Sequence, residues 1–467
     1  MPKNYEIAVL GGGPGGYVAA IRAAQLGFSV VVIDKDNLGG ICLNWGCIPT
    51  KSLLKNAEMY DLMKNHSNDF GISVEGLKFD FKKIIKRSRD ISDSITKNVE
   101  LLIKKNKVDR IKGFGKFVSR NQIDIFDTEK KKIDSIHAEK IILATGASSK
   151  IFPNIPVDRK NIITSTEAMI LNTLPKELII IGAGAIGVEF AYFYSVLGTK
   201  VTLIEMMDQI LPVEDKEVSE TLSKSFKKRG IEILISTKVI NAELKNNSVV
   251  VQIEREGKKF ELIAEKVLSA IGVSGNTEGI GLENVGIQTE RGHIKVNRKN
   301  YQTNIPNIYA IGDVIGPPWL AHVASAEAIA CIEGIKGLHP SPIDYSTIPG
   351  CTYCQPQVAS VGMTEQAALN AGFEIKVGKF PFMASGKAFA IGEREGFVKL
   401  IFDKKYGELL GAHIIGSEAT ELIGELTLAK SMEATFESIV KTVHAHPTLT
   451  ESIMEAAANA YGESIHI

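Results

Sequence analysis

The stretch Tyr5-Glu-Ile-Ala-Val-Leu-Gly-Gly-Gly-Pro-Gly-Gly16 joins a short apolar run to a cluster of glycines. An apolar run of this length is typical of a buried strand in a parallel sheet. The motif Gly11-x-Gly13-x-x-Gly16 that follows allows a tight turn and lets backbone N–H groups approach a pyrophosphate at a helix N-terminus. We expect a helix next, then a second strand from Ser29 to Ile33, with Asp34 after it to bond a ribose.

The same pattern occurs a second time. The apolar run Glu177–Ile181 precedes Gly182-x-Gly184-x-x-Gly187, and a helical stretch, the strand Lys200–Ile204 and Glu205 follow. In both copies the acid lies eighteen residues after the third glycine. One glycine motif is weak evidence, but two complete copies predict two Rossmann-like dinucleotide-binding domains. The alternative, glycine-rich turns in an α/β protein that binds no nucleotide, is disfavoured by the doubling.

Two further apolar runs end in small-residue turns, Lys140–Ala147 and Asn307–Asp313. They fit the points where the chain leaves and re-enters the first nucleotide domain. The lysine-rich stretch from Phe81 to Lys107 has apolar residues at helical spacing, so we expect a helix with a solvated charged face. The last hundred or so residues mix strand and helix patterns, which predicts a separate α+β domain.

Composition limits the possible functions. The 467 residues are too many for one core. The 54 basic and 54 acidic side chains give a formal net charge of +0, which argues against nucleic acid or an anionic membrane as partner.

Leu178–Gly198 is apolar enough to suggest a membrane span, but it contains Glu189 and three fingerprint glycines and divides into strand, turn and helix. Five cysteines do not suit a secreted disulfide scaffold. We expect a bacterial cytoplasmic protein, or an organellar matrix protein if a presequence has been removed.

Two cysteines stand just after the first fingerprint, in Gly39-Gly-Ile-Cys-Leu-Asn-Trp-Gly-Cys-Ile-Pro-Thr-Lys51. A bridge between Cys42 and Cys47 would close only a very short loop and so add little stability. Their position beside a bound cofactor therefore favours a disulfide that is repeatedly made and broken. Spacing alone would equally allow buried, unreactive thiols.

A candidate base lies near the C-terminus, in His444-Ala-His446-Pro-Thr-Leu-Thr-Glu451. Thiol–disulfide exchange needs a thiolate and hence a nearby base. If the turn at Pro447 leads into a helix, Glu451 can reach back and orient the imidazole of His446. Two alternatives stay open: a metal site, which no further Cys or His cluster supports, and a structural histidine pair at a helix end.

Residues 39–51 resemble the redox-active motif of the pyridine nucleotide-disulfide oxidoreductases, and the similarity spans almost the whole chain in the family's order. The resemblance implies an α/β fold with two Rossmann-like dinucleotide-binding domains, for FAD and NAD, plus a C-terminal α+β dimerisation domain. The implied domains are 1–149 (FAD-binding), 150–273 (NAD-binding), 274–345 (a central domain completing the FAD site) and 346–467 (dimerisation).

The resemblance also implies roles for single residues. Cys42 would meet the substrate, and Cys47 would lie against the flavin. Lys51, partnered by Glu189, would lie near the flavin ring. His446 and Glu451 would form an acid–base dyad that reaches the dithiol of the other subunit of a homodimer. The expected FAD contacts are Gly11, Gly13, Gly16, Asp34, Lys51, Thr145, Gly146 and Asp313, the expected NAD contacts are Gly182, Gly184, Gly187, Glu205 and Gly272, and no metal is expected.

Glu205 narrows the choice within the family. A carboxylate at this position bonds the ribose hydroxyl of NAD and repels the extra phosphate of NADP. The chain ends Gly462-Glu-Ser-Ile-His-Ile467, without a second pair of cysteines. The dihydrolipoamide dehydrogenase branch fits best, which implies oxidation of protein-bound dihydrolipoamide, with lipoyl domains of E2 or H-protein as partners. The alternative is an NADH-dependent flavin diaphorase or oxidase that uses no disulfide substrate.

Three features depart from the family's pattern. Trp45 replaces a smaller apolar residue between the cysteines, and the sequence gives no reason for it. Gly272-Val-Ser-Gly-Asn276 stands where many relatives have a Gly-Arg-x-Pro-Asn turn. Cys351-x-x-Cys354 has no counterpart in the shared chemistry, and we interpret its cysteines as ordinary thiols.

Overall fold

The computed structural model describes residues 2–467 and contains two compact units. The first consists of the chain up to Ser52, Lys83–Lys150 and Gly272–Ile343. The second consists of Leu53–Lys82, Ile151–Ile271 and Asp344–Ile467. The division into four domains that the sequence predicts is finer than this and stays a prediction.

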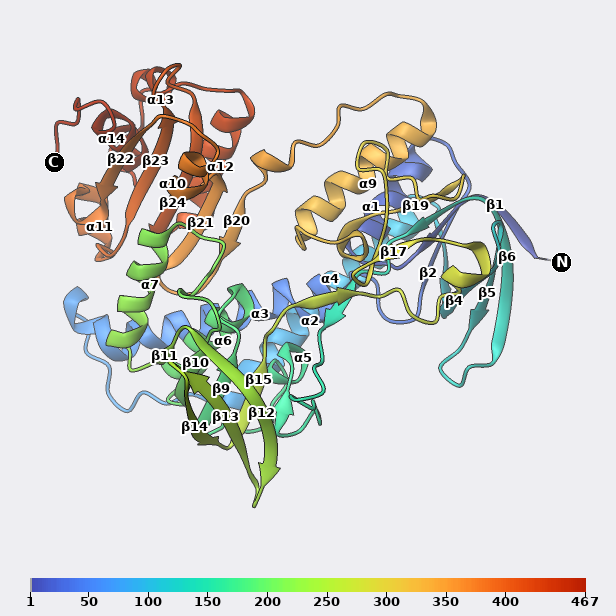
Figure 1. Ribbon diagram of the computed structural model, residues 1–467, viewed down its shortest axis with the longest axis horizontal. Coiled ribbons are helices and arrows are strands. Elements are labelled where there is room, and N and C mark those ends of the chain that lie inside the picture. The colour runs from blue at the N-terminus through green and yellow to red at the C-terminus, as the bar shows by residue number, and fades with distance from the viewer. Residues whose placement is uncertain (1) are drawn as a thin grey trace. The chain divides into compact units, whose positions relative to one another are not determined.

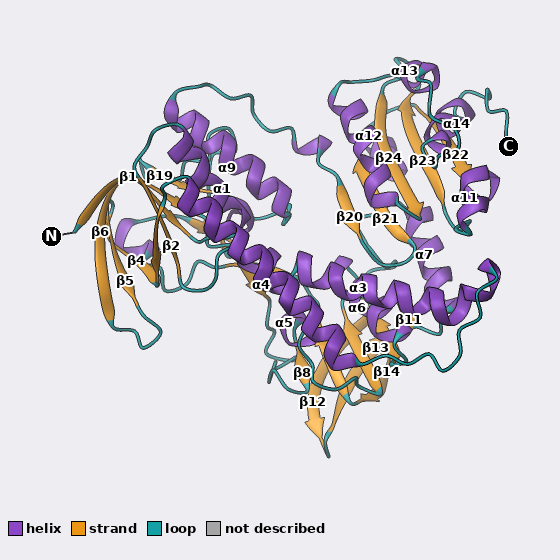
Figure 2. Ribbon diagram, turned by 180° about the vertical axis from the view of Figure 1, so that it is seen from behind, coloured by secondary structure: helices purple, strands orange, loops and turns teal. Residues whose placement is uncertain are grey.

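The first unit is built on a parallel sheet in the strand order β3-β2-β1-β6, with β19 on the other side of β6. The first half of the long strand β6 pairs antiparallel with β5, which pairs with β4, so β5 and β4 extend the same seven-stranded sheet. Helices α1 and α9 pack side by side (Figure 1, Figure 2). The elements of this unit are β1 (Lys3–Leu10), α1 (Pro14–Gln25), β2 (Val30–Asp34), α2 (Gly40–Trp45), the start of α3 (Cys47–Asp61), most of α4 (Phe81–Lys105), β3 (Asp109–Lys112), β4 (Phe114–Ser119), β5 (Gln122–Phe126), β6 (Lys132–Leu143), β7 (Ala147–Ser149), β16 (Val273–Gly275), α8 (Leu282–Val285), β17 (Thr289–Glu290), β18 (His293–Ile294), β19 (Ile308–Ala310), the 3-10 helix Gly312–Ile315 and α9 (Ala321–Lys336).

The second unit repeats this plan. Its parallel sheet has the order β11-β10-β9-β15-β8, so β9, β10 and β11 correspond to β1, β2 and β3. The internal repeat read from the sequence is therefore confirmed as a repeat of topology. The elements are a π-helix (Leu62–His66), a 3-10 helix (Ser67–Phe70), β8 (Ile162–Ile163), α5 (Ser165–Ala168), β9 (Glu177–Ile181), α6 (Ala185–Val196), β10 (Lys200–Ile204), α7 (Lys216–Lys228), β11 (Glu232–Leu234), the antiparallel β12 (Thr237–Lys245), β13 (Ser248–Arg255) and β14 (Lys258–Ala264), and β15 (Lys266–Ser269).

The C-terminal part of this unit is the α+β arrangement expected from the sequence. A five-stranded antiparallel sheet has the order β20-β21-β24-β23-β22, and apolar side chains of α12 and α14 pack into its core. The elements are the 3-10 helix Tyr345–Thr347, β20 (Gly350–Thr352), β21 (Gln357–Gly362), α10 (Glu365–Asn370), β22 (Ile375–Pro381), the 3-10 helix Phe382–Ala384, α11 (Gly386–Ile391), β23 (Phe397–Asp403), β24 (Leu409–Gly416), α12 (Ala419–Ser431), α13 (Phe436–Lys441) and α14 (Glu451–Asn459).

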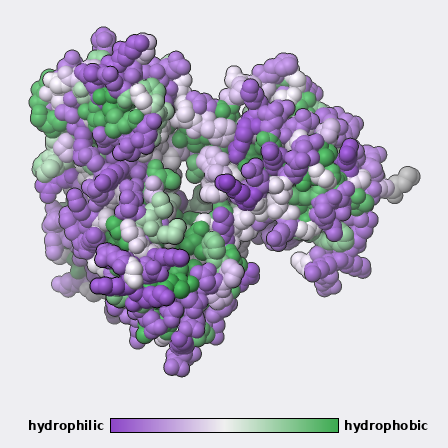
Figure 3. All heavy atoms as spheres, viewed as in Figure 1, coloured by the Kyte–Doolittle hydropathy of each residue, from purple (hydrophilic) through white to green (hydrophobic). Residues whose placement is uncertain are grey.

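The surface carries mainly hydrophilic side chains on the face that Figure 3 shows, with hydrophobic ones in smaller patches. No helix in the described part of the chain has both the length and the apolar character needed to cross a membrane. Leu178–Gly198, which raised that possibility, divides into β9, a turn and α6, as expected.

Candidate active site

The two fingerprints have the same local geometry. Asp34 accepts hydrogen bonds from the backbone N–H groups of Gly12 and, at 2.7 Å, Asp36. In the second copy, Glu205 accepts from Ala183 at 2.7 Å and from Met207 at 2.9 Å. Each acid is thus held at the carboxyl end of its strand, beside the glycine turn, where a ribose would meet it.

The glycines of each fingerprint do two different things. A Cβ added to Gly16 would lie 1.8 Å from the carbonyl oxygen of Gly11, and one added to Gly187 would lie 1.9 Å from that of Gly182. These glycines are required by close backbone packing. A Cβ on Gly184 would meet no atom within 4 Å, so packing of the chain itself does not explain that glycine. Open space at a helix N-terminus fits a pyrophosphate.

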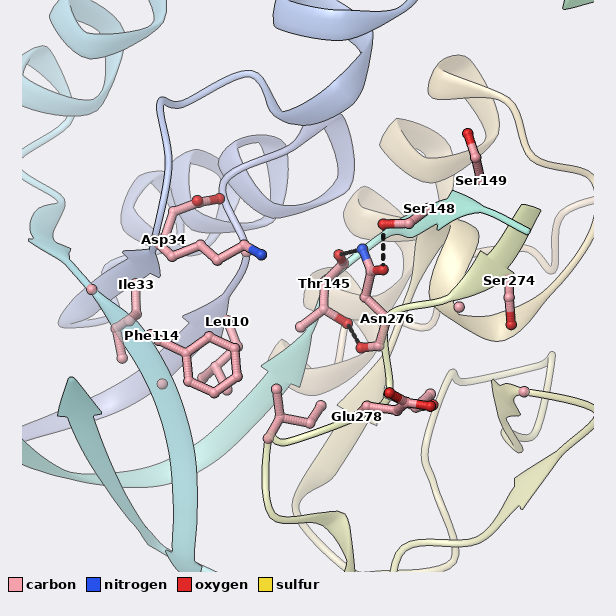
Figure 4. A pocket seen from close by; sticks show the side chains of 18 residues that line it. Leu10, Ile33, Asp34, Phe114, Thr145, Ser148, Ser149, Ser274, Asn276 and Glu278 are labelled. Atoms are coloured by element: carbon pink, nitrogen blue, oxygen red, sulfur yellow. Dashed lines mark hydrogen bonds between the residues drawn. The ribbon is translucent and has the colours of Figure 1, made fainter. Parts of the chain in front are cut away.

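A pocket opens beside the first fingerprint, with a cavity volume of about 370 Å³. Figure 4 shows Asp34 and Phe114 on one side of it and Thr145, Ser148 and Asn276 on the other. Gly11 also lines it. The predicted FAD contacts Gly11, Asp34 and Thr145 therefore share one cavity, whose polar and apolar lining suits a nucleotide.

Asn276 is a pocket residue that the sequence interpretation did not include. Its side chain donates to the Thr145 carbonyl at 2.8 Å and accepts from the Ser148 hydroxyl at 2.7 Å, and its carbonyl accepts from the Thr145 hydroxyl at 2.8 Å (Figure 4). Its N–H donates to Gly146 at 2.9 Å. The chain thus leaves and re-enters this unit through one hydrogen-bonded crossing. The position of Asn276 directly after Gly272-x-x-Gly275 was the sequence signal from which this pocket residue could have been predicted.

Asp313 lies in the 3-10 helix that follows β19, and Gly312 beside it donates to Glu327 at 2.7 Å. Glu327 is buried and pairs with Arg298 at 3.1 Å. Burial and the charge of Glu327 raise the pKa of Asp313 to about 6. A buried carboxyl at this turn suits a polar group such as the ribityl chain of a flavin.

The dithiol segment packs directly on the first fingerprint. The N–H of Gly39 donates to the carbonyl of Gly12 at 2.7 Å. A Cβ on Gly40 would lie 2.7 Å from the Cα of Gly13, so the two backbones touch. Cys42 lies in α2 and Cys47 begins α3, with Gly46 between the two helices. The cysteines are therefore held by the same turn that is expected to bind FAD.

The thiol of Cys42 interacts directly with that of Cys47. A hydrogen bond with Cys47, burial and the charge of Cys47 raise the pKa of Cys42, whereas Lys51 lowers it. The protonated form of Cys42 is therefore favoured. The role of Cys47 as the thiolate against the flavin stays a prediction.

The C-terminal histidines have different environments. His446 is exposed, and its Nδ1 lies 2.9 Å from a carboxylate oxygen of Glu451, the first residue of α14. The other oxygen of Glu451 accepts from the Thr448 N–H at 2.9 Å. Burial raises the pKa of Glu451, but the bonds from Thr448 and His446 outweigh it and the pKa is lowered. The expected reach of Glu451 back to His446 is confirmed, and because Nδ1 makes this contact, Nε2 is the ring nitrogen that the predicted base role would use.

His444 has a different environment. Its Nε2 lies 2.8 Å from Glu425 and its Nδ1 lies 2.9 Å from the Thr442 carbonyl. Its side chain is only 5% exposed. The buried position of His444 and its contact with Glu425 set it apart from the exposed His446; the alternative of a structural histidine pair at a helix end is not tested.

The other predicted site residues lie as follows. Lys51 is on α3, and Glu189 is buried on α6, where it accepts from the Tyr353 N–H at 2.9 Å. Cys354 is buried and its sulfur lies 3.4 Å from the Pro356 carbonyl, and Cys351 is half-buried in β20. Within residues 2–467, no group of three His, Cys, Asp or Glu side chains is placed to hold a metal ion.

Comparison with known proteins agrees with this geometry. Residues 5–328 match the family described as pyridine nucleotide-disulphide oxidoreductase, and residues 348–457 match its dimerisation domain. The chain belongs to this family. It is a disulfide oxidoreductase with FAD and NAD as cofactors, and it forms a homodimer.

Curated relatives that match over the full length include proteins named dihydrolipoyl dehydrogenase. The chain is 45% identical to dihydrolipoyl dehydrogenase of Rhizobium etli and 43% identical to that of Bacillus subtilis, each covering 100% of both chains. Among solved structures it is similar to LpdA from Mycobacterium tuberculosis, with a TM-score of 0.89 and 28% identity over 97% of this chain and 99% of that one. It is also similar to the HOCl-induced flavoprotein disulfide reductase RclA from Escherichia coli, with a TM-score of 0.86 and 27% identity over 97% and 99% of the two chains.

Proposed function

We propose that this chain catalyses the dihydrolipoyl dehydrogenase reaction, in which dihydrolipoamide and NAD⁺ give lipoamide, NADH and H⁺. The observation that supports it most directly is the contact of the dithiol segment with the first fingerprint, through Gly39–Gly12 and Gly40–Gly13. A dithiol so placed can pass electrons between a disulfide substrate and a bound flavin. The full-length relatives named above support the same reaction.

The dithiol performs the exchange in the following way. A thiolate of dihydrolipoamide attacks Cys42 in the Cys42–Cys47 disulfide, and Cys47 leaves as a thiolate. The second substrate thiolate then attacks the substrate sulfur of the mixed disulfide, which releases lipoamide and leaves the protein pair reduced by two electrons. The raised pKa of Cys42 fits this order, since Cys42 leaves last and takes a proton.

His446 is the proposed base. Its Nδ1 is held by Glu451, so Nε2 can take the proton of a substrate thiol and later return it to Cys42. We propose that this dyad serves the dithiol of the partner subunit in the homodimer.

The cofactors are held by the residues of the two fingerprints. Bound FAD supplies two-electron transfer from the dithiol, and NAD accepts the electrons as hydride. The turns at Gly13 and Gly184 would hold the pyrophosphates, and Asp34 and Glu205 would bond the riboses. We assign Lys51 and Glu189 a supporting role near the flavin and the nicotinamide.

The physiological substrate is the lipoyl group of a partner protein. We propose a lipoyl domain of E2 in a 2-oxo acid dehydrogenase complex, or H-protein of the glycine cleavage system. The bacterial relatives support a place in the bacterial cytoplasm, with an organellar matrix as the alternative for a processed chain.

Anaerobic titration with NADH tests the proposed function. The protein should take up two electrons with a long-wavelength charge-transfer absorption, and Cys47→Ser should lose this band. Cys42→Ser should keep its flavin but lose dihydrolipoamide oxidation. A chain that only bleaches on titration, and whose Cys42→Ser variant still oxidises dihydrolipoamide at the normal rate, would instead be a flavin diaphorase.

A further inference from the structure

Trp45, which the sequence left unexplained, has a partner on α4. The guanidinium carbon of Arg89 lies 4.6 Å from the centroid of the Trp45 ring. The same guanidinium donates through Nη2 to the carbonyl of Asn44 at 2.5 Å and to the Ser92 hydroxyl at 2.6 Å. Arg89 thus contacts two consecutive residues of the segment that joins the two thiols.

A second contact holds the same segment. The Asn44 side chain is buried and donates to the carbonyls of Leu38 and Gly40, at 3.0 and 2.9 Å. Its oxygen accepts from the Thr96 hydroxyl at 3.1 Å. Thr96 follows Arg89 by seven residues, or two helical turns, so both project from one face of α4.

The face of α4 that carries Arg89 and Thr96 has small side chains, which allow the dithiol segment to pack closely against it. Ser88, Ser92 and Thr96 are small, polar and buried at intervals of four residues, which puts them in one row along the helix. The helical spacing of apolar residues in α4 predicts that its charged side chains are solvated. For Arg89 this expectation is wrong, because the side chain is half-buried over Trp45.

We infer that Arg89 is a positioning residue of the dithiol, which acts by stacking on Trp45 and bonding the Asn44 carbonyl. The inference rests on the proposed function of Cys42 and Cys47. Within the described residues the Nη1 of Arg89 is buried and makes no hydrogen bond. The cation–π contact with the indole face therefore supplies the interaction that a third hydrogen bond would otherwise give.

Comparing Arg89→Lys with Arg89→Ala distinguishes the effect of the contact with Trp45 from the effect of positive charge alone. A lysine would keep the charge, but its compact tetrahedral ammonium cannot lie over the ring and donate to Asn44 at the same time, as the planar guanidinium does. Arg89→Lys should therefore behave like Arg89→Ala. If charge alone mattered, lysine would restore the wild-type behaviour.

The test uses the full-length, flavin-loaded dimer and four variants: Arg89→Ala, Arg89→Lys, Trp45→Val and the double variant Arg89→Ala/Trp45→Val. Two rates are measured, dihydrolipoamide oxidation by NAD⁺ and NADH oxidation by ferricyanide, which bypasses the dithiol. A third readout is the rate at which iodoacetamide alkylates Cys42 in the reduced protein, followed by mass spectrometry. Lys86→Ala is the matched control, because Lys86 lies on the same helix but only pairs with Asp90 at the surface.

We expect Arg89→Ala and Arg89→Lys to lower kcat/KM for dihydrolipoamide by about tenfold, to change the alkylation rate, and to leave the ferricyanide rate within about twofold of wild type. The double variant should lose less than the product of the two single losses, since the two side chains act together. Lys86→Ala should match wild type.

Three results would overturn the inference: wild-type kinetics and alkylation in Arg89→Ala, a parallel fall of both rates, or single losses that multiply in the double variant. Failure of the proposed function would look different. The wild-type protein itself would then fail to oxidise dihydrolipoamide while still reducing ferricyanide.

Discussion

Glu451 makes its two hydrogen bonds only as a carboxylate. Its pKa is lowered by the Thr448 N–H and His446 against the effect of burial. A carboxyl group with a lowered pKa in the folded state adds stability that is complete above its ordinary pKa of about 4.3 and is lost as pH falls through the folded value. Glu451 should therefore stabilise the C-terminal segment at neutral pH and cease to do so in acid.

Replacing Glu451 by Gln tests this at the residue scale. We expect Glu451→Gln to lower the rate of dihydrolipoamide oxidation by at least about tenfold, because general acid–base catalysis contributes about 10²–10⁴-fold and needs an oriented imidazole. Its thermal midpoint should lie below wild type at pH 7, and the two should converge as pH falls below about 4. Rates and midpoints measured over this pH range give the answer.

Glu437 provides the control for that variant. It lies on the neighbouring α13 and forms an exposed pair with Lys441 at 2.7 Å. Exposed pairs of this kind contribute little, so Glu437→Gln should match wild type in both measurements. A difference between wild type and Glu451→Gln that persists unchanged in acid would contradict the role given to the carboxylate.

At the scale of the element, the fingerprint of α6 allows packing to be separated from binding. Gly187→Ala places a Cβ 1.9 Å from the Gly182 carbonyl, so the turn must move, and we expect a loss of stability of about 1–3 kcal/mol. Gly184→Ala meets nothing within 4 Å, and its φ of −71° suits alanine. It should fold normally and weaken NADH binding by at least about tenfold, because the methyl group occupies the space of the pyrophosphate.

Thermal unfolding and calorimetric titration with NADH distinguish the two variants. Gly334→Ala in α9 is the control, since its Cβ also meets nothing within 4 Å and Gly334 belongs to neither fingerprint. It should keep both stability and NADH affinity. Unaltered affinity in Gly184→Ala would exclude the α6 N-terminus as the pyrophosphate site.

At the scale of the whole molecule, the dyad and the dithiol are proposed to meet across the homodimer. Co-refolding Cys42→Ser with His446→Ala tests this. Each variant alone is expected to be inactive. In a mixed dimer, one site combines an intact Cys42 with an intact His446 from the other chain. Random assortment makes half of the dimers mixed, so about one quarter of wild-type activity should return.

A site contained within one chain would give no recovery at all, because every chain then lacks one of the two residues. Mixing Cys42→Ser with itself is the control for the refolding step. The amount of mixed dimer can be checked by mass spectrometry before the rates are compared.

The sequence predicted best those features that depend on residues close together in the chain. The two fingerprints, the acids Asp34 and Glu205, and the reach of Glu451 to His446 depend on residues within about twenty positions of each other, and backbone geometry limits what such short stretches can do. The contacts that were missed join distant segments. Asn276 bonds Thr145 across 131 positions, and Arg89 bonds Asn44 across 45.

From the sequence alone follow the doubled nucleotide fold and the predictions of a redox pair and a base, because glycine spacing, apolar periodicity and thiol chemistry are properties of the chain itself. The tertiary structure decided which neighbours these groups have. It placed the backbone of Gly40 on that of Gly13, and it brought Arg89 over Trp45. Those contacts arise when separate helices and strands bury their faces together, and no local pattern specifies which faces will meet.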